Sequence, residues 1–482
     1  MVQFAQPPRS RVQAFAGEIK PVALALGLVF GLGVGTVPAA SAATITVNNL
    51  SGTTVAGQCT LRDALLAADT DAAVQGCAAG SGADTINFSV TGTIPLATQL
   101  TVNSDVTISG PGAANLTLAP SSTNRALYLQ NAHTVSISGV TFQGNGTAIP
   151  DGAAIYNYAG ALTIQNSVFS GNVSSGQGGA IYNYGGKVVI KSSTFSGNRA
   201  NMGGAIYNYR GTISIDASTL SGNQSSSDGG AIALYQDTSS PTSSLTITNS
   251  TLSGNRANGG TLGGAISMHN TAASSITNST ISGNSAGQGG AIVLYRAILV
   301  VSNSTITGNS ASGFGGAFNL FQGGDAVSPR LDLVSTIVAN NTDNTGTADI
   351  ARITGTVNAT SSLIFNPAGN INGINVANIT GQNPLLGALA NNGGPTLTHA
   401  LLAGSPAIDK GINPLALAFD QRGTPFARSS GVTDIGAFEI QGAPPPAGNV
   451  PVPTLSQWSL ALLSAMMAGW AMLTGFGRRR RK

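Results

Sequence analysis

Residues that could act in catalysis are few in this sequence, and their spacing brings none of them together. Hydrolysis of a glycosidic bond usually needs two facing carboxylates. The aspartates in the middle of the chain contain no Asp-Asp pair and occupy different positions of an internal repeat: Asp151, Asp216, Asp228, Asp237, Asp325 and Asp332. Lyase chemistry needs a clustered basic residue, but Lys187 and Lys191 have no carboxylate beside them in the sequence. None of the histidines His133, His269 and His399 lies in a nucleophile motif. The sequence therefore favours a protein that is not an enzyme and has no cofactor.

Charged residues are densest near the C-terminal end, at Asp409, Asp420, Arg422, Asp434 and Glu439. Asp409, Asp420 and Asp434 could supply carboxylate oxygens to calcium. The alternative is an ion-paired group that packs against the fold, and the presence of Arg422 favours this second interpretation. No metal is therefore expected, although calcium stays as the competing hypothesis.

Cys59 and Cys77 are the only cysteines, and they lie 18 residues apart. In an exported segment such a pair indicates a disulfide, whose loop would restrain the unfolded chain by about 3 kcal/mol. A metal site would need further ligands, and no histidine lies nearby.

A periodic column of aromatic residues is the candidate ligand-binding surface. Three residues beyond a repeated isoleucine stand Tyr158, Tyr184, Tyr209, Tyr235, His269, Tyr295 and Phe321. A shorter companion stripe consists of Tyr156, Tyr182 and Tyr207. Aligned rings would suit a long sugar polymer, and Tyr158, Tyr184, Tyr209, Tyr235 and Tyr295 are the proposed binding residues. Alternatively, the rings stack on one another and serve stability alone.

The repeat itself predicts the elements that position these rings. Gly-Asn recurs every 25 to 32 residues, each time three positions after an apolar residue, with its asparagine at Asn145, Asn172, Asn198, Asn223, Asn255, Asn284 and Asn309. A second motif, Gly-Gly-Ala-Ile, recurs in phase at Gly178, Gly203 and Gly229. Such periods indicate a solenoid. Each period holds three short β-prone stretches separated by Gly, Asn and Ser, which supply turns. The predicted fold is an all-β, right-handed parallel β-helix with three strands per coil. The right-handed form is expected because parallel strands strongly prefer right-handed crossovers.

The recurring asparagines should form a structural ladder inside this solenoid. Equivalent residues of neighbouring coils lie about 4.8 Å apart, so each asparagine can hydrogen-bond its copies above and below. Ile337 and Asn340 are expected to continue the register. About 14 coils are expected between Asp84 and Glu439.

The two ends of the chain predict export. Arg9, Arg11 and Lys20 precede an apolar run and an Ala-x-Ala site, which indicates a signal peptide cleaved after Ala42. An uncleaved N-terminal anchor is the alternative. At the other end, residues 458–476 are apolar and 478–482 are basic, as in a transmembrane helix with a cytoplasmic tail.

Charge argues against nucleic acid as a partner. The whole chain carries +3, with 21 basic and 18 acidic residues. Removing the leader and the basic tail leaves 13 and 17, a net charge of −4. The remaining cations form no basic patch.

These features define six segments. They are a signal peptide (1–42), an N-terminal cap (43–83), β-helix repeats (84–390), a C-terminal end or cap (391–440), a Pro/Gly linker (441–451) and a sorting signal with a helix and basic tail (452–482).

Val452-Pro453-Thr454-Leu455-Ser456-Gln457-Trp458, followed by the apolar run and basic tail, resembles the IPTL-CTERM sorting signal of Gram-negative bacteria. Val452 replaces the usual Ile of that family. The resemblance covers about 31 residues, with Pro453, Thr454, Leu455 and Trp458 as the motif positions. It implies recognition by an exosortase-type protease after signal peptidase has acted. A permanent single-pass anchor is the alternative.

Three further resemblances concern the rest of the chain. The paired F-x-x-N and G-G-A-I motifs from Phe142 to Phe321 resemble the repeats of chlamydial polymorphic outer membrane proteins, which are adhesins. Cys59-Thr60-Leu61-Arg62-Asp63-Ala64-Leu65 is similar to the CSLREA segment, with Thr60, Asp63 and Leu65 departing from it. Segments between Asn392 and Glu439 resemble the choice-of-anchor Q region.

Together these features predict an exported, surface-associated, non-catalytic protein. The expected role is adhesion, envelope or matrix structure, or association with exopolysaccharide, with a polysaccharide or cell-surface molecule as ligand. The expected route is an inner-membrane intermediate held by the C-terminal helix, then the cell surface or the outside. Parallel β-helices include pectate lyases and polygalacturonases, so a polysaccharide lyase or hydrolase remains the alternative.

Overall fold

The computed structural model describes residues 42–441, apart from 122, 145–148, 238–242, 260, 323–327, 345–348 and 430. The predicted leader, the sorting motif with its apolar helix, Asn145 and Asp325 lie outside the described residues. Among the residues that are described, no helix has the length and apolar character needed to cross a membrane.

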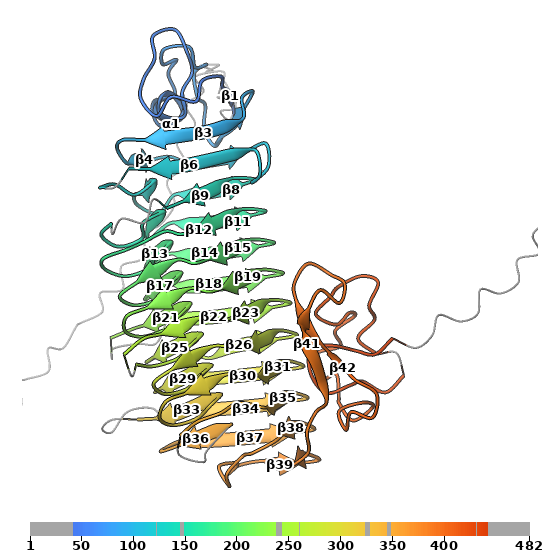
Figure 1. The fold of residues 1–482 in the computed structure, drawn as a ribbon. Coiled ribbons are helices and arrows are strands. Elements are labelled where there is room, and N and C mark those ends of the chain that lie inside the picture. The colour runs from blue at the N-terminus through green and yellow to red at the C-terminus, as the bar shows by residue number, and fades with distance from the viewer. Residues whose placement is uncertain are drawn as a thin grey trace, which may run out of the picture. The chain divides into compact units, whose positions relative to one another are not determined.

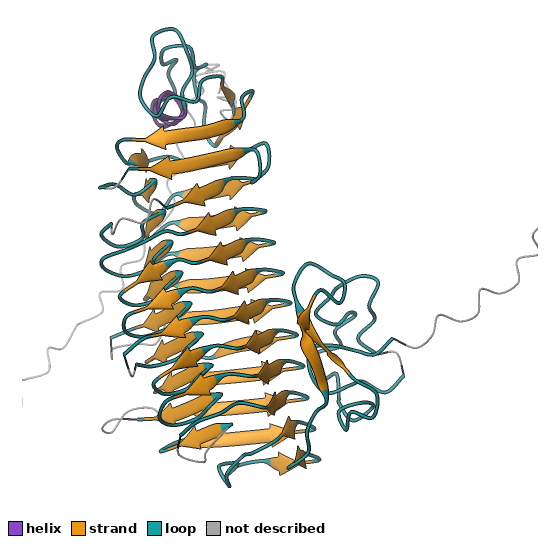
Figure 2. Ribbon diagram, in the orientation of Figure 1, coloured by secondary structure: helices purple, strands orange, loops and turns teal. Residues whose placement is uncertain are grey.

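The described chain is a parallel β-solenoid in which each coil contributes one strand to each of several sheets (Figures 1 and 2). Alternation of apolar and polar residues explains the strands. In β14 (Lys187–Lys191), Val188 and Ile190 are fully buried, while Lys187 and Lys191 are exposed. The same pattern recurs in the coils before and after, in β11 (Ala161–Gln165) and β18 (Thr212–Asp216), so the side chains stack in register.

We name the sheets A to D in the order in which a coil passes through them. Sheet A contains β1 (Thr44–Val47), β2 (Asp84–Phe88), β5 (Val106–Ser109), β8 (Thr134–Ser138), β11 (Ala161–Gln165), β14, β18 (Thr212–Asp216), β22 (Ser244–Thr248), β26 (Ser274–Thr277), β30 (Ile298–Ser302), β34 (Arg330–Val334), β37 (Thr356–Thr360) and β39 (Asn375–Val376). Sheet B contains β3 (Gly92–Leu96), β6 (Leu116–Pro120), β9 (Thr141–Gln143), β12 (Val168–Ser170), β15 (Thr194–Ser196), β19 (Thr219–Ser221), β23 (Thr251–Ser253), β27 (Thr280–Ser282), β31 (Thr305–Thr307), β35 (Ile337–Ala339), β38 (Leu363–Ile364) and β40 (Ile379–Thr380).

Sheet C is short and contains β16 (Arg199–Ala200), β20 (Gln224–Ser225), β24 (Arg256–Ala257), β28 (Ser285–Ala286) and β32 (Ser310–Ala311). Sheet D contains β4 (Leu100–Val102), β7 (Leu127–Leu129), β10 (Ile155–Tyr158), β13 (Ile181–Tyr184), β17 (Ile206–Tyr209), β21 (Ile232–Tyr235), β25 (Ile266–His269), β29 (Ile292–Tyr295), β33 (Phe318–Phe321) and β36 (Ile350–Arg352). Three strands per coil were expected, so the two-residue strands of sheet C are an addition that the sequence did not indicate.

Turns with positive φ separate the sheets. Asn166, Asn249 and Asn278 hold φ of 50°, 51° and 54° between sheets A and B, a conformation that asparagine tolerates well. The second glycine of the Gly-Gly-Ala-Ile motif is needed for a different reason. A Cβ at Gly204 would overlap the carbonyl oxygen of Gly230 in the next coil. The motif therefore marks a place where the neighbouring coil leaves no room for a side chain.

Stacked side chains fill the interior. Phe142, Phe169 and Phe195 form a ring stack with centroid spacings of 4.6 and 4.5 Å. Beside it runs the asparagine ladder, in which each Nδ2 donates to the Oδ1 of the next coil. The bonds are 2.8 to 2.9 Å long and join Asn172, Asn198, Asn223, Asn255, Asn284, Asn309 and Asn341 in turn. The last amide, of Asn341, donates to the carboxylate of Asp349 over 2.8 Å.

The ladder corrects one sequence expectation. Asn340 was expected to follow Asn309, but Asn341 does so, because Ile306 aligns with Val338 and not with Ile337. Asn340 holds φ of 59° and precedes the ladder residue, as Gly308 does with φ of 65° in the preceding coil. Asparagine occupies both positions here, so the sequence alone could not settle the register.

Two further ladders were missed. Asn157, Asn183 and Asn208 are fully buried in sheet D, and their amides pass from coil to coil over 2.7 and 2.6 Å. The repeated Ile-Tyr-Asn-Tyr could have predicted this ladder, because its asparagine recurs together with the two tyrosines. At the corner between sheets A and B, serine hydroxyls accept the backbone N–H of the preceding coil, as Ser218 does from Ser193 at 3.1 Å.

The N-terminal end is covered by helix α1 (Leu61–Thr70), which lies against the first coil (Figure 1). Thr60 caps the helix and exchanges hydrogen bonds with Asp63, an arrangement that stabilises a helix start. Arg62 donates to the carbonyl oxygens of Gly52, Thr98 and Gln99, joining the helix to the coil below. A disulfide links Cys59 to Cys77.

Residues 386–441, which we call the lateral segment, lie beside the solenoid against sheet B (Figure 1). It contains the antiparallel pair β41 (Leu386–Ala390) and β42 (Thr398–Leu401). Threonine hydroxyls that project from sheet B hold it: Thr251 donates to Leu397 O, and Thr280 donates to Gln421 Oε1, both at 2.6 Å. Residues 391–440 were expected to form the C-terminal end or cap of the β-helix. Sheets A, B and D have 13, 12 and 10 strands among the described residues, compared with the roughly 14 coils expected.

Candidate functional site

The aromatic column lies at the carboxyl ends of the strands of sheet D. Strand registers align Tyr158, Tyr184, Tyr209 and Tyr235, followed by His269, Tyr295 and Phe321. Neighbouring ring centroids are 5.2 to 6.2 Å apart. The structure therefore brings together all five tyrosines that the sequence analysis proposed for ligand binding.

The orientation of the rings limits how they could contact a ligand. Tyr158 and Tyr184 are nearly parallel, with 11° between their planes, so the two faces that meet are covered. Tyr158 and Tyr235 remain 41% and 38% exposed. Farther along, the Tyr295 and Phe321 rings are tilted by 57°, which uncovers part of a face. The column therefore offers a strip of partly exposed rings, whose faces are covered where neighbours are parallel and partly open where neighbours are tilted.

The companion stripe is a packing element. Tyr182 and Tyr207 are buried, and they pack with Ala233 and Met202. Burial raises the pKa of both phenols above the ordinary value of 10. This stripe also includes Tyr128, whose ring centroid lies 5.4 Å from that of Tyr156.

Three arginines lie beside aromatic rings, and they were not predicted from the sequence. Arg210 lies 5.0 Å from the centroid of Tyr209 and pairs with Asp237. Arg296 lies at the same distance from Tyr295. Arg125 lies 4.8 Å from Tyr156, and burial lowers its pKa. The Tyr-Arg dipeptides at 209–210 and 295–296 could have predicted two of these contacts, because the residue after each column tyrosine turns back beside the ring.

His269 interrupts the column and has a polar environment of its own. Its Nε2 lies 2.9 Å from Ser267 Oγ and 3.5 Å from Asp228 Oδ2. Burial holds the pKa of His269 below 6.5, against the raising effect of Asp228. A serine triad needs the carboxylate on the opposite ring nitrogen. Here both partners approach the same nitrogen, so the group does not have that geometry.

The aspartates of the repeats are dispersed. Asp151 and Asp228 occupy the same repeat position, just before Gly152 and Gly229, which corrects the expectation that all phases differ. Gln177 and Met202 occupy that position in the coils between them. The two aspartates are thus three coils, or about 14 Å, apart. Paired carboxylates in glycosidases lie roughly 5 to 10 Å apart, so this pair does not fit.

On sheet A, Lys191 aligns with Asp216 of the next coil, so a carboxylate does accompany the lysines, contrary to the sequence expectation. Asp216 Oδ1 accepts hydrogen bonds from Thr248 and Asn249 at 2.7 and 2.8 Å. Asp332 pairs with Arg330 at 3.1 Å. Neither aspartate faces a second carboxylate among these contacts.

The charged residues of the lateral segment form an internal network. Asp420 is fully buried and forms an ion pair with Arg422 at 2.6 Å. The Arg422 guanidinium lies between the rings of Phe426 and Phe438, 3.9 and 3.8 Å from their centroids. These contacts fit the ion-paired alternative from the sequence.

The other predicted calcium residues are arranged differently. Asp434 accepts the backbone N–H groups of Asp409 and Ile440, and burial raises its pKa. The Asp409 side chain is exposed. Within the described ranges, no group of three or more His, Cys, Asp or Glu residues is placed to hold a metal ion.

We expect EDTA to leave the melting temperature of the protein unchanged. The Asp420 and Asp434 carboxylates already accept hydrogen bonds from Arg422 and from backbone N–H groups, so they have little capacity left for a cation. Differential scanning calorimetry with added EDTA, and with added calcium, measures this. A lower melting temperature in EDTA that calcium restores would establish the calcium hypothesis instead.

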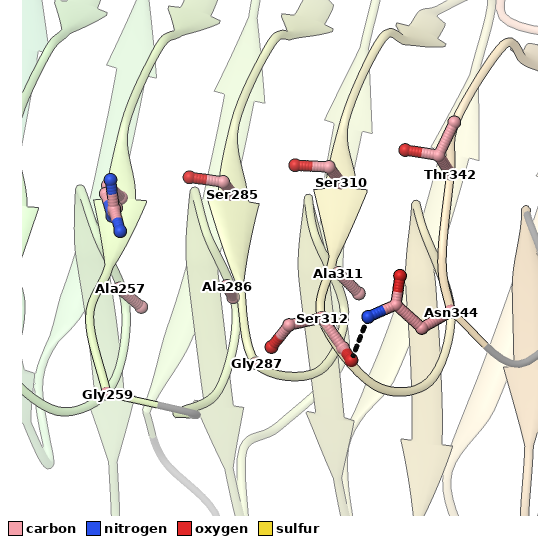
Figure 3. Close-up of a pocket in the computed structure, with 11 residues that line it drawn as sticks. Ala257, Gly259, Ser285, Ala286, Gly287, Ser310, Ala311, Ser312, Thr342 and Asn344 are labelled. Carbon is pink, nitrogen blue, oxygen red and sulfur yellow. Dashed lines mark hydrogen bonds between the residues drawn. The ribbon is translucent and has the colours of Figure 1, made fainter.

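Sheet C carries a second surface, a shallow groove of about 530 Å³ (Figure 3). Its strands present Arg256, Ser285 and Ser310 outward in successive coils, and Thr342 continues the row. Ala257, Ala286 and Ala311, the second residues of these strands, are buried and form a second row along the groove.

Comparisons with known proteins agree with this architecture. Residues 125–262 match the family model described as a right-handed beta helix region, and residues 450–481 match the IPTL-CTERM motif. No curated protein matches the sequence significantly. Among solved structures, pectate lyase Pel9A aligns at 14% identity, covering 83% of this chain and 96% of its own, with a TM-score of 0.49. A PL6 alginate lyase in complex with a trisaccharide aligns at 13% identity, covering 82% and 94%, with a TM-score of 0.35. Likenesses this distant carry no argument about ligand or reaction.

The chain is thus a right-handed parallel β-helix protein. It ends in an IPTL-CTERM sorting motif, which indicates a secreted, surface-directed protein.

Proposed function

We propose that this protein binds an extended polysaccharide non-catalytically, along the aromatic column of sheet D, at the bacterial surface. The observation that supports the proposal is the run of seven neighbouring rings over seven successive coils, of which Tyr158 and Tyr235 are 41% and 38% exposed. A linear polymer matches such a strip because both have a regular repeat along one direction.

The chemistry of the strip supports sugar binding through hydrogen bonds. The phenol hydroxyls of its tyrosines can donate to and accept from sugar hydroxyls. Arg210 and Arg296 lie beside Tyr209 and Tyr295 and add donors along the strip. Tilted rings near Phe321 add partial faces for the apolar side of a sugar.

The remaining predictions from the sequence complete the proposal. Export by a leader cleaved after Ala42, membrane insertion of residues 458–476 and processing by an exosortase-type enzyme would deliver the solenoid to the surface. The resemblances to CSLREA, polymorphic-outer-membrane and choice-of-anchor Q segments agree with a role in adhesion or in the extracellular matrix.

Replacing Tyr184, Tyr209 and Tyr235 by alanine is expected to weaken retention of the protein on polysaccharide about a hundredfold, since each ring contributes roughly 1 kcal/mol. Affinity electrophoresis through gels that contain acidic or neutral polysaccharides gives the dissociation constants. Tyr-to-Phe changes at the same positions keep the stack and remove the hydroxyls. The matched control is Thr163→Ala, Val189→Ala and Ser214→Ala, three outward residues of sheet A in the same part of the solenoid. Equal retention of the alanine variant and the unmodified protein would exclude the column as the binding site.

The competing function, a polysaccharide lyase or hydrolase, is tested with the same polymers. We expect no new reducing ends and no unsaturated uronate absorbance after a day with the unmodified protein. Product formation from any polymer would replace the binding proposal by an enzymatic one.

A further inference from the structure

The groove of sheet C is built unlike the rest of that sheet. Its outward row changes from Arg199 and Gln224 to Arg256, Ser285 and Ser310, and then Thr342. The first two residues precede the groove, and the last four line it. Beyond Arg256 the outward side chains are short, as serine or threonine occupies the position in each of the next three coils.

The polar groups in the groove have unused hydrogen-bonding capacity. Within the described chain, the Arg256 guanidinium and the hydroxyls of Ser285, Ser310 and Thr342 make no hydrogen bond or ion pair. Elsewhere in the groove, Asn344 Nδ2 donates to the carbonyl oxygen of Ser312 at 2.9 Å. The row from Arg256 to Thr342 thus offers one guanidinium and three hydroxyls to a ligand.

The arrangement is regular along the solenoid axis. Figure 3 shows the hydroxyls of Ser285, Ser310 and Thr342 side by side, one per coil. At about 4.8 Å per coil, the row from Arg256 to Thr342 spans about 14 Å. Its volume of about 530 Å³ lies within the range of small-ligand sites, roughly 300 to 1,000 Å³.

These features select one class of ligand. A peptide that adds a strand needs a free sheet edge, whereas each groove strand already pairs within sheet C. A nucleic acid needs many cations, whereas the groove holds Arg256 alone. A row of hydroxyls with one guanidinium at its end suits sugar hydroxyls and one carboxylate, which arginine binds through two parallel hydrogen bonds.

We propose that this groove binds a short segment of a uronate-containing glycan, with a carboxylate on Arg256 and sugar hydroxyls on Ser285, Ser310 and Thr342. The site is separate from the aromatic column of sheet D, so the two are tested independently.

The test is isothermal titration calorimetry of the full-length protein with an oligogalacturonate and with a neutral oligogalactose of equal length. Arg256→Gln is expected to raise the Kd for the oligogalacturonate about tenfold, the loss of one charge-assisted contact. The affinity for the neutral oligomer should not change. Arg199→Gln is the matched control, because Arg199 has the same strand position two coils outside the groove, and this change should leave both affinities unchanged.

A second variant, Ser285→Val/Ser310→Val/Thr342→Val, removes the hydroxyls and keeps residues of high β-propensity. It is expected to weaken binding of both oligomers.

Equal effects of Arg256→Gln and Arg199→Gln, or no binding of the oligogalacturonate to the unmodified protein, would overturn the groove proposal. If the triple tyrosine variant alone abolishes binding, the column is the acidic-glycan site and the groove proposal is wrong. If groove variants behave as expected while polymer retention survives the tyrosine changes, the groove stands and the proposed column site fails.

Discussion

Replacing Asn255 by alanine is expected to lower the free energy of unfolding by about 3 to 5 kcal/mol, because each buried polar group left without a partner costs roughly 1 to 3 kcal/mol. Asn255 Oδ1 accepts from both the backbone N–H and the Nδ2 of Asn223, at 3.0 and 2.9 Å. Its own Nδ2 donates to Leu220 O and Asn284 Oδ1, at 3.0 and 2.9 Å. One substitution therefore removes bonds in two neighbouring coils at once.

The measurement is a urea unfolding curve followed by circular dichroism. Gln224→Ala is the matched control, because Gln224 follows the ladder residue of the preceding coil and points outward from sheet C. That change should have little effect, as is usual for surface substitutions, within roughly 0.5 kcal/mol. A similar midpoint for both variants would show that the ladder contributes little to stability.

The end of the ladder should make stability depend on pH. Asp349 is fully buried, and this burial raises the pKa of its carboxyl from 3.8 to about 6, although hydrogen bonds from Asn366 and Asn341 favour the charged form. The folded protein therefore keeps a proton that the unfolded chain loses between about pH 4 and pH 6. The stabilising effect of that proton is complete below pH 4 and is lost as the pH rises through 6.

At neutral pH the buried charge is expected to cost about 3 kcal/mol relative to the protonated form, since each pKa unit corresponds to 1.36 kcal/mol. Asp349→Asn should remove this pH dependence while its Oδ1 still accepts the amide of Asn341. The stability difference between variant and unmodified protein should shift in favour of the variant by about 3 kcal/mol from pH 4 to pH 7. Urea curves at several pH values test this, with the exposed Asp71→Asn change as a control for losing one carboxylate. Parallel pH profiles for Asp349→Asn and the unmodified protein would contradict the assignment.

Much of the solenoid could be predicted from its sequence because the repeat determines local structure. Phe169, Phe195 and Leu220 are aligned in sheet B as their spacing predicted, and Tyr184 and Tyr209 are aligned in sheet D. Coils that differ in length still align as predicted, because the motifs re-establish the register in each coil. The disulfide between Cys59 and Cys77 was also predictable, because no other cysteine competes for either partner.

The remaining features depend on contacts between distant segments, which the repeat does not encode. Gln421 donates to Thr251 and Thr396 and accepts from Thr280, and these bonds fix the lateral segment against sheet B. Thr194 occupies the same outward position as Thr251, but none of the bonds described here joins it to the lateral segment. The column of threonines alone therefore could not predict which coils the lateral segment covers. The sequence predicted Asn340 and not Asn341 as the ladder residue for a related reason. Asparagine occupies both positions, so a one-residue shift of the register cannot be recognised in the sequence.

The one-way direction of the asparagine ladder has a consequence for how such a protein can change over evolutionary time. Each rung accepts from the coil before it and donates to the coil after it, so Asn198, Asn223 and Asn255 are interchangeable as partners. Duplication or deletion of one whole repeat by unequal recombination would leave every amide paired. At the two boundaries the described chain differs, because helix α1 covers the first coil and Asp349 accepts the last amide of the ladder. The gene could thus gain or lose length in units of one coil, without selection having to redesign the interior.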